Sequence, residues 1–289
     1  LFINEDGELE FKLGGGRGKV SSFSSRKPLL RKVWYKVFAS YDAEKGQVVI
    51  GQIPYLTATN GGHGMSMLHP REETEVVKKY SAPAISLSQN ECPLLMAAST
   101  SETHTGRLLS GGHYDHLKEP LEVPEHTTKF NGKIERPRLS NAALGRDQIE
   151  ILLNNQRLEG IPTELRSSII GFWDFCENIS IDAASTKITD CSPNHLHGVG
   201  VNLPVRGVIG HNWSSHFMSF KHGPQEYGAI HFHDESVDDA RWKNSFTLKI
   251  TDKMTSGVYA ARLRVNGKST PDHEDYIPFF VKPPSGTTT

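Results

Sequence analysis

Apolar and polar residues alternate along several stretches of the chain, and this alternation predicts β-strands. Residues 8–13 alternate charged and apolar side chains directly after an Asp-Gly pair, which is typical of a strand that follows a tight turn. A second hairpin is predicted at residues 34–53, where two runs rich in aromatic and β-branched residues flank a turn that ends at Gly46. Similar runs at residues 245–250 and 276–281 predict strands near the C-terminus. Many short strands joined by such turns predict a β-sandwich.

One segment has helical spacing instead. Ile149, Leu152 and Leu153 recur at the period of an α-helix, which predicts a helix at about residues 142–154 with one apolar stripe packed on the outside of the sandwich. Residues 60–125, in contrast, are rich in Gly, Pro, His and Ser and predict long surface loops. Loops of this length carry a binding site or a subunit contact more often than chance.

The pattern divides the chain into two predicted domains. Residues 1–215 are expected to form a mainly β sandwich with long loops, and residues 216–284 a small β-domain. Residues 285–289 are expected to be a linker or terminus, and the boundary between the domains is placed near Ser215. The chain opens on three apolar residues, which favours an origin as a fragment of a longer polypeptide.

Composition excludes several classes of function. The net charge is -1, so neither nucleic acid nor a membrane surface is expected as a partner. The apolar runs are also too short to span a bilayer. With three cysteines and no secretory leader, reduced thiols at Cys176 and Cys191 and a cytoplasmic location are expected, and a disulfide between these two is the alternative.

A first set of motifs resembles the laminin-G or concanavalin-A-like jelly roll. It consists of the aromatic run at residues 34–42, the turn glycine Gly46 and a later hairpin at residues 130–135 that ends at an acidic residue. The resemblance implies a jelly-roll sandwich with one packed helix, followed by a small Ig-like β segment.

A second set of motifs extends over the rest of the chain. In order, it comprises Trp173-Asp174-Phe175, Asp190-Cys191-Ser192, His197-Gly198, Val201-Asn202-Leu203-Pro204, Arg206, Gly210-His211-Asn212-Trp213 and residues 226–234, 256–264 and 274–284. This set resembles the large (beta) subunit of N,N-dimethylformamidase and its relatives.

The resemblance implies an amidohydrolase that releases formate and dimethylamine with a protein-bound iron. In that family two tyrosines and a glutamate hold the metal, in an amidotransferase-like catalytic domain that follows the last of these motifs. The present chain ends at Thr289, so we expect no catalytic residue and no cofactor in it and little activity by itself. As partners, the resemblance implies the downstream catalytic domain, a small subunit and an oligomer.

Histidines are the most numerous candidate ligands, with fourteen in the chain. His231 and His233 lie two residues apart on a predicted strand, so both rings face one side as a metal-binding pair does. A hydrogen-bonded pair inside the sandwich is the competing and favoured interpretation.

Two glycine-flanked loops hold further candidates. His113, Asp115 and His116 lie in one loop and His63 in another, and glycines allow such loops to gather side chains without strain. These residues are candidates for a ligand-binding or subunit-contact site, and ordinary surface loops are the competing and favoured interpretation.

Three functional hypotheses follow. The first is a non-catalytic, supporting region of a metal-dependent amide hydrolase. The alternative is a lectin-like module that binds a glycan or protein with its loop rim. The third is a small metal enzyme built on His231 and His233.

Overall fold

The structure is a computed structural model, and it describes most of the chain. The described residues are 1–14, 19–55, 75–85, 93–100, 107–109, 114, 116–123, 126–179, 186–233, 243–265 and 274–283. Of these, 42% lie in strands and 9% in helices, so the predicted mainly β fold is confirmed. Within these ranges no helix is long and apolar enough to cross a membrane.

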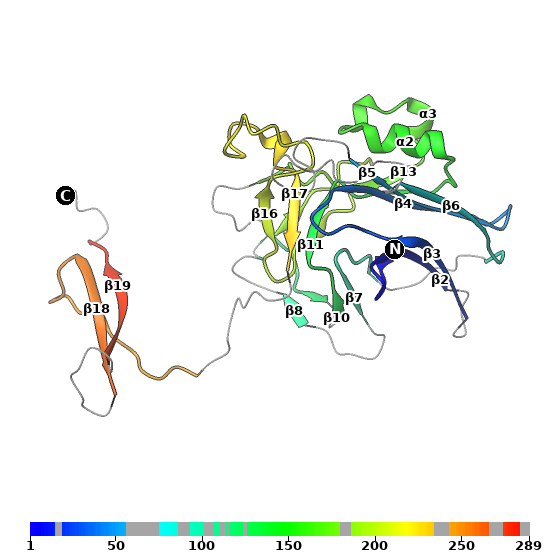
Figure 1. The fold of residues 1–289 in the computed structure, drawn as a ribbon. Coiled ribbons are helices and arrows are strands. Elements are labelled where there is room, and N and C mark those ends of the chain that lie inside the picture. Colours follow the sequence, from blue (N-terminus) through cyan, green and yellow to red (C-terminus); the bar gives the residue numbers. More distant parts are fainter. Residues whose placement is uncertain are drawn as a thin grey trace. The chain divides into compact units, whose positions relative to one another are not determined.

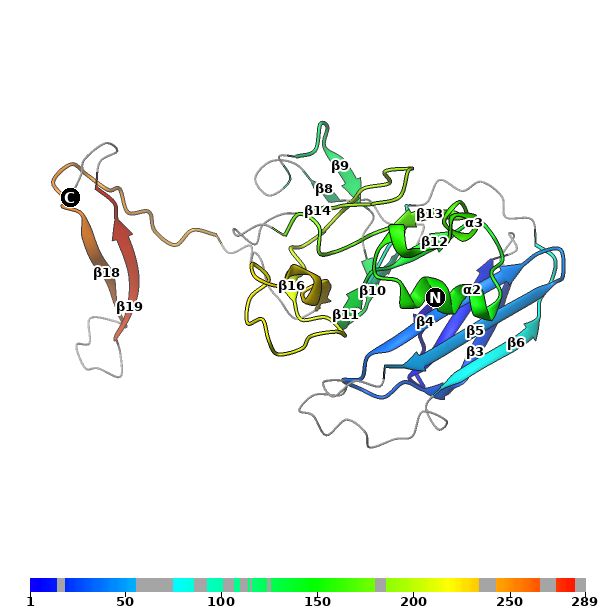
Figure 2. The same cartoon turned by 90° about the horizontal axis from the view of Figure 1, so that it is seen from above.

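Two compact units divide the chain. The first is Leu1–Asp238 and the second is Asp239–Thr289, and both are drawn in Figures 1 and 2. This division lies later than the boundary that the sequence placed near Ser215. The difference arises from strand pairing, because β17 (Ala229–Phe232) hydrogen-bonds only to strands of the first unit among the described residues.

Six strands form two stacked sheets in the N-terminal part of the first unit. The first sheet consists of β1 (Phe2–Ile3), β2 (Glu8–Gly14) and β3 (Val20–Pro28), and the second of β4 (Tyr35–Asp42), β5 (Gln47–Pro54) and β6 (Val76–Ser81). Leu13 and Phe23 of the first sheet pack against Val48 of the second. The two sheets therefore lie face to face, as Figure 1 shows.

Both hairpins predicted from the alternation are present. Gly7, in the turn between β1 and β2, has a φ of 78°, and Gly46, between β4 and β5, has a φ of 57°. A Cβ at Gly46 would also lie 2.9 Å from the carbonyl oxygen of Ala82. Glycine is thus required at the second turn by both conformation and space.

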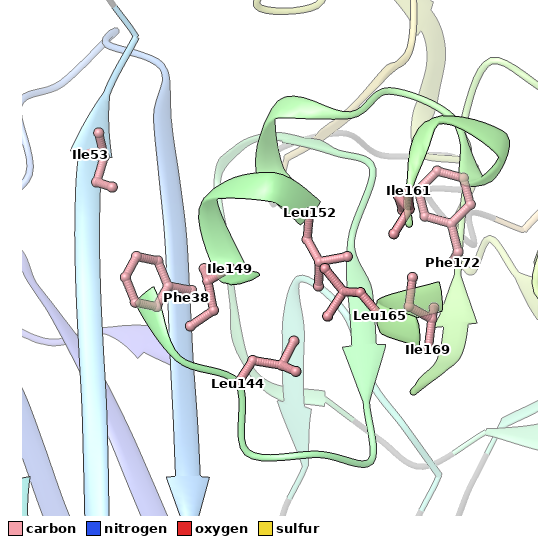
Figure 3. Packing of buried hydrophobic residues seen from close by; sticks show 9 residues of the cluster. All are labelled: Phe38, Ile53, Leu144, Ile149, Leu152, Ile161, Leu165, Ile169 and Phe172. Atoms are coloured by element: carbon pink, nitrogen blue, oxygen red, sulfur yellow. The ribbon is translucent and has the colours of Figure 1, made fainter. Parts of the chain in front are cut away.

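A layer of helices and a short strand covers the other face of the second sheet. It contains α2 (Arg146–Asn154), η2 (Leu158–Gly160), α3 (Thr163–Arg166) and β13 (Ile169–Phe172). Phe38 and Ile53 of the sheet share a buried cluster with Ile149 and Leu152 of α2 (Figure 3). The helix predicted at residues 142–154 is confirmed with a later start, and its apolar stripe packs on the outside of the sheet.

A third sheet, with strand order β11-β17-β16, is assembled from segments far apart in the sequence. It contains β11 (Gly132–Glu135), β16 (Val205–Val208) and β17, and η3 (Pro224–Glu226) immediately precedes β17. Ile230 of β17 shares a buried cluster with Trp173 and Phe175, which follow β13 in the chain. Trp173 also forms an isolated antiparallel bridge with Asp190, directly after the end of β13.

Four shorter strand pairs complete the described part of the first unit. They are β7 (Ala98–Thr100) with β10 (His126–Lys129), β8 (Arg107–Leu109) with β9 (Leu121–Val123), β12 (Arg138–Ser140) with β13, and β14 (Lys187–Ile188) with β15 (Gly198–Val199).

The second unit contains one long antiparallel hairpin. Its strands β18 (Gly257–Arg264) and β19 (Glu274–Val281) pair over their full length. The prediction of a strand at residues 245–250 is wrong. This segment forms neither strand nor helix, and no described strand pairs with it. The predicted linker at residues 285–289 lies outside the described residues.

We predict that alanine substitutions of two isoleucines on α2 differ sharply in their effect on the free energy of unfolding. Ile149 is 6% exposed in the core, whereas Ile151 is 38% exposed. Ile149→Ala should lower the free energy of unfolding by about 2–5 kcal/mol, since it removes buried methylenes and leaves a cavity. Ile151→Ala should cost about 1 kcal/mol or less. Chemical denaturation of both variants checks this, and equal losses would contradict the packing described for α2.

Candidate functional site

The turn Glu135-Arg136-Pro137-Arg138 redirects the chain from β11 into β12. Arg136 has a φ of 45°, in the left-handed region that non-glycine residues rarely adopt. It also precedes a proline, which restricts its backbone further. Such strain persists only where the surrounding contacts hold the residue in place. The side chains of this turn supply those contacts.

Arg136 is the centre of a buried polar network. Its side chain is 6% exposed, and its Nη1 forms an ion pair with Oε1 of Glu135, whose side chain is 5% exposed. Its Nε lies 3.5 Å from Oδ1 of Asp174. Its Nη2 donates to the carbonyl oxygen of Gln225 at 3.1 Å and contacts Sγ of Cys176 at 3.2 Å. Two carboxylates thus compensate this guanidinium.

Glu135 uses its second carboxylate oxygen to hold His211, in the loop after β16. Oε2 accepts a hydrogen bond from the His211 backbone N–H at 2.9 Å and lies 2.8 Å from ring Nδ1. Burial alone raises the pKa of Glu135, but the hydrogen bond and charge of His211, together with Arg136, bring it below its usual value.

Aromatic side chains at the end of the β4–β5 hairpin cover His211. The centres of the Tyr55 and His211 rings are 4.2 Å apart. The Trp34 ring is oriented edge-on to the same imidazole, with 6.5 Å between the ring centres. Lys36 Nζ lies 4.8 Å from the centre of the Tyr55 ring. Burial, and then the charge of Glu135, raise the pKa of Tyr55 to about 12, so its phenol is neutral at physiological pH.

The two cysteines with described positions are free thiols, as the sequence analysis expected. Burial, followed by the charge of Asp174, raises the pKa of Cys176 to about 12. Burial also raises the pKa of Cys191. Because the thiolate is the nucleophile, neither residue has the character of a reactive cysteine.

A second network, around Asp190, organises the loop after β14. Its carboxylate accepts hydrogen bonds from the backbone N–H groups of Phe172, Ser192 and Leu196. The Ser192 hydroxyl donates to the same carboxylate at 2.7 Å, while Nδ1 of His197 accepts from the Asp190 backbone N–H at 3.1 Å. The Ser192 hydroxyl thus donates to Asp190, and His197 Nδ1 accepts from a backbone N–H, so both side chains hold this loop in place.

Of the histidine pair predicted from the sequence, His231 lies on β17 and His233 directly follows this strand. The ring centres of His231 and His233 are 5.6 Å apart and the rings are nearly perpendicular. Burial, then the nearby His233 and Lys133, lower the pKa of His231. In the described ranges, no group of three or more His, Cys, Asp or Glu side chains gathers around a possible metal position. The described residues therefore do not form a ligand set for the iron that the resemblance implies, and a metal at this pair stays a prediction.

Of the four residues predicted to form a loop site, only His116 lies within the described ranges. His116 Nδ1 lies 3.4 Å from the hydroxyl of Thr186, which links its loop to the segment before β14. His63, His113 and Asp115 lie outside the described residues. The loop site therefore stays a prediction.

Sequence reasoning missed the residues that form the main network. It treated Glu135 only as the acidic end of a hairpin and His211 only as part of a motif, and it did not single out Arg136, Arg138 or Tyr55. Two arginines on either side of a proline, directly after a strand, are the available signal. A charged pair in that position has to be either exposed or compensated in the interior.

The fold and the network first define a class of protein. This is a mainly β module whose buried polar groups tie together segments distant in the sequence. The network joins the β4–β5 hairpin, the β11–β12 turn, the segment after β13, the loop after β16 and η3.

The comparisons with known proteins give the family. Residues 205–289 match the family model described as "N,N-dimethylformamidase beta subunit-like, C-terminal". The chain is 34% identical over 288 residues to the N,N-dimethylformamidase beta subunit of Alcaligenes sp and 33% identical over 289 residues to that of Paracoccus aminophilus. Each alignment covers 99% of this chain and 34% of the relative. The chain belongs to the N,N-dimethylformamidase beta subunit-like family, and it spans about a third of the length of the curated relatives it matches.

We predict that Glu135→Gln lowers stability by about 3–5 kcal/mol at neutral pH, because it leaves Arg136 with one carboxylate partner in the interior. The folded-state pKa of Glu135 is below its usual value. Its contribution is therefore fully present above the unfolded-state pKa of about 4.3 and is lost as the pH falls through the folded-state value. Urea midpoints measured between pH 3 and 7 should show this acid loss in the wild type and a weaker one in the variant.

Glu119→Gln is the matched control, since Glu119 is exposed. It should keep the wild-type midpoint and its pH dependence. A wild-type-like Glu135→Gln variant would contradict the assigned network.

Proposed function

We propose that this chain is a non-catalytic, supporting region of a metal-dependent amide hydrolase of the N,N-dimethylformamidase type. The proposed enzyme hydrolyses amides such as dimethylformamide to formate and an amine, with its iron bound by parts of the polypeptide outside this chain. Similarity over nearly the whole chain to one third of the beta subunits supports the assignment. In this proposal the described residues shape and hold the enzyme and take no part in the chemical step.

The observation that carries this proposal is the exposed apolar surface on both faces of the β18–β19 hairpin. Val258 and Phe280 are cross-strand partners on one face and are 71% and 75% exposed. Leu263 and Ile277 lie on the opposite face and are 39% and 46% exposed. A hairpin of two strands is marginally stable by itself. Apolar side chains on both faces are typical of strands that are covered on both sides.

The occupant that we propose for these faces is the remaining part of the same family's beta subunit. The hairpin lies within the region that matches the C-terminal family model, and the curated relatives are about three times as long as this chain. The hairpin also bears a cluster of ion pairs, in which Glu274 pairs with both Arg262 and Arg264. This patch would orient the contact, while the apolar residues would supply most of its free energy.

The proposal includes the finer features that the resemblance implies. These are a laminin-G-like or concanavalin-A-like jelly roll in the first unit, an Ig-like arrangement in the second, a small partner subunit, an oligomer and a cytoplasmic location. The face-to-face packing of the first two sheets supports the sandwich. The names of the relatives, which are beta subunits, support a partner subunit.

We predict that residues 1–289 expressed alone release no formate from dimethylformamide but bind the separately expressed remainder of a beta subunit. Formate release and co-purification are the two measurements. Amide hydrolysis by residues 1–289 alone would contradict the supporting role. Failure of the two parts to co-purify would contradict the proposed contact.

Phe280→Ser tests the surface itself. Loss of a buried aromatic side chain costs about 1.5–3 kcal/mol, so the dissociation constant of the two parts should rise by roughly 10–100-fold. Met218→Ser is the matched control, because Met218 is 80% exposed in the first unit. It should leave the dissociation constant unchanged, and an equal effect of both substitutions would refute a specific role of the hairpin.

A further inference from the structure

The two edges of the β18–β19 hairpin differ in the backbone groups that they present. In an antiparallel pair, residues alternate between those whose N–H and C=O groups bond to the partner strand and those whose groups point away from it. The groups that point away form the outer edge of each strand. A row of unpaired groups on such an edge is a template for one more strand.

Pro278 and Tyr276 identify the residues of β19 that point outward. The ladder pairs Ala260 with Pro278 and continues without a register shift on both sides of this pair. Because proline has no N–H, an inward-facing Pro278 would remove a ladder hydrogen bond, so this residue fits the outward-facing set. The Tyr276 N–H donates to Oδ1 of Asp275 at 2.8 Å, outside the ladder. Both observations therefore assign the even-numbered residues of β19 to its outer edge.

The outer edge of β19 is closed to a further strand over its central part. Pro278 offers no donor there, and the N–H of Tyr276 already donates to the side chain of Asp275. Proline on an edge strand is one of the ways in which proteins prevent strand pairing.

The outer edge of β18, in contrast, is open. Among the described residues, no third strand belongs to this sheet and no loop carbonyl accepts from the outward-facing N–H groups of β18. The charges on this strand do not oppose a neighbour, since Glu274 pairs with both of its arginines. The outward-facing residues are the cross-strand partners of the even-numbered residues of β19, namely Val258, Ala260, Arg262 and Arg264.

We propose that the outer edge of β18 binds one extended segment from the remainder of the family's beta subunit through main-chain hydrogen bonds. This inference rests on the proposed function, which assigns that remainder to the faces of the same hairpin. A hairpin of two strands is marginally stable by itself, whereas three or more strands with a covered apolar face are stable. The added strand would complete such a sheet, and its main-chain bonds would supply affinity.

A second copy of this chain is a weaker occupant for the edge. Pairing of two β18 strands would extend the sheet but would leave apolar faces uncovered, because each copy brings the same exposed residues, Val258 and Phe280 among them. The other two thirds, roughly, of the relatives' length can supply both the strand and the cover.

Ala260→Pro tests the edge, because it removes one outward-facing N–H from the middle of β18. Ala260→Val is the matched control, since it adds bulk at the same position and keeps the N–H. The measurement is the dissociation constant between the 289-residue chain and the separately expressed remainder of a beta subunit. Ala260→Pro should raise it by about 10–100-fold. Ala260→Val should keep the wild-type value.

Pro278→Ala tests the opposite edge. It restores a donor on β19 directly across from Ala260, and it should leave the dissociation constant unchanged because the added strand lies along β18.

The outcomes separate this inference from the proposed function. Wild-type affinity in Ala260→Pro would overturn pairing at the edge. Equal losses in Ala260→Pro and Ala260→Val would also overturn it, because contacts on the face would then account for binding and the supporting role would stand. No binding by the wild-type chain would refute the proposed contact and this inference together.

Amide hydrogen exchange of the wild-type chain, resolved to single residues, keeps the proposal testable if Ala260→Pro does not fold. Binding of the remainder should slow exchange at Val258, Ala260 and Arg262 by about tenfold or more, and should leave Phe280 on the β19 edge unchanged. An Ala260 N–H that is already protected in the chain alone, or that exchanges equally fast in the complex, would refute strand addition.

Discussion

The compensation of Arg136 by Glu135 and Asp174 is the interaction on which the rest of the first unit depends. A guanidinium with a 6% exposed side chain is tolerated only because two carboxylates lie within ion-pair distance. The same contacts hold Arg136 at a φ of 45° before a proline, and so fix the turn that sends the chain from β11 into β12. Through that turn, β11 of the β11-β17-β16 sheet leads into β12, which pairs with β13 of the helix layer.

The network also explains why the family's C-terminal region is not an independent domain in this chain. The matching region begins at residue 205, where β16 starts, and contributes β17, His211 and Gln225 to the first unit. A boundary at Ser215 would cut through the sheet and the network. Strand pairing and buried charge therefore place the division after Asp238. This arrangement joins segments that are distant in the sequence into one compact unit.

Short-range features were predictable from the sequence. Alternation identified the β1–β2 and β4–β5 hairpins, and Gly7 and Gly46 lie in their turns with positive φ. Helical spacing identified the stripe of Ile149 and Leu152. The same reasoning failed at residues 245–250, because alternation shows only that a segment is suited to a sheet. A strand also needs a partner, and none of the described residues provides one.

The sequence by itself determined the mainly β class, the turns, the helix and the family, since each is encoded by neighbouring residues or by ordered motifs. Only the tertiary structure decided which charges meet. Glu135 and His211 are 76 positions apart, and Arg136 and Gln225 are 89 apart. Local patterns carry no information about such pairs, because a buried charge is stabilised by whatever partner the folded chain brings within a few ångströms.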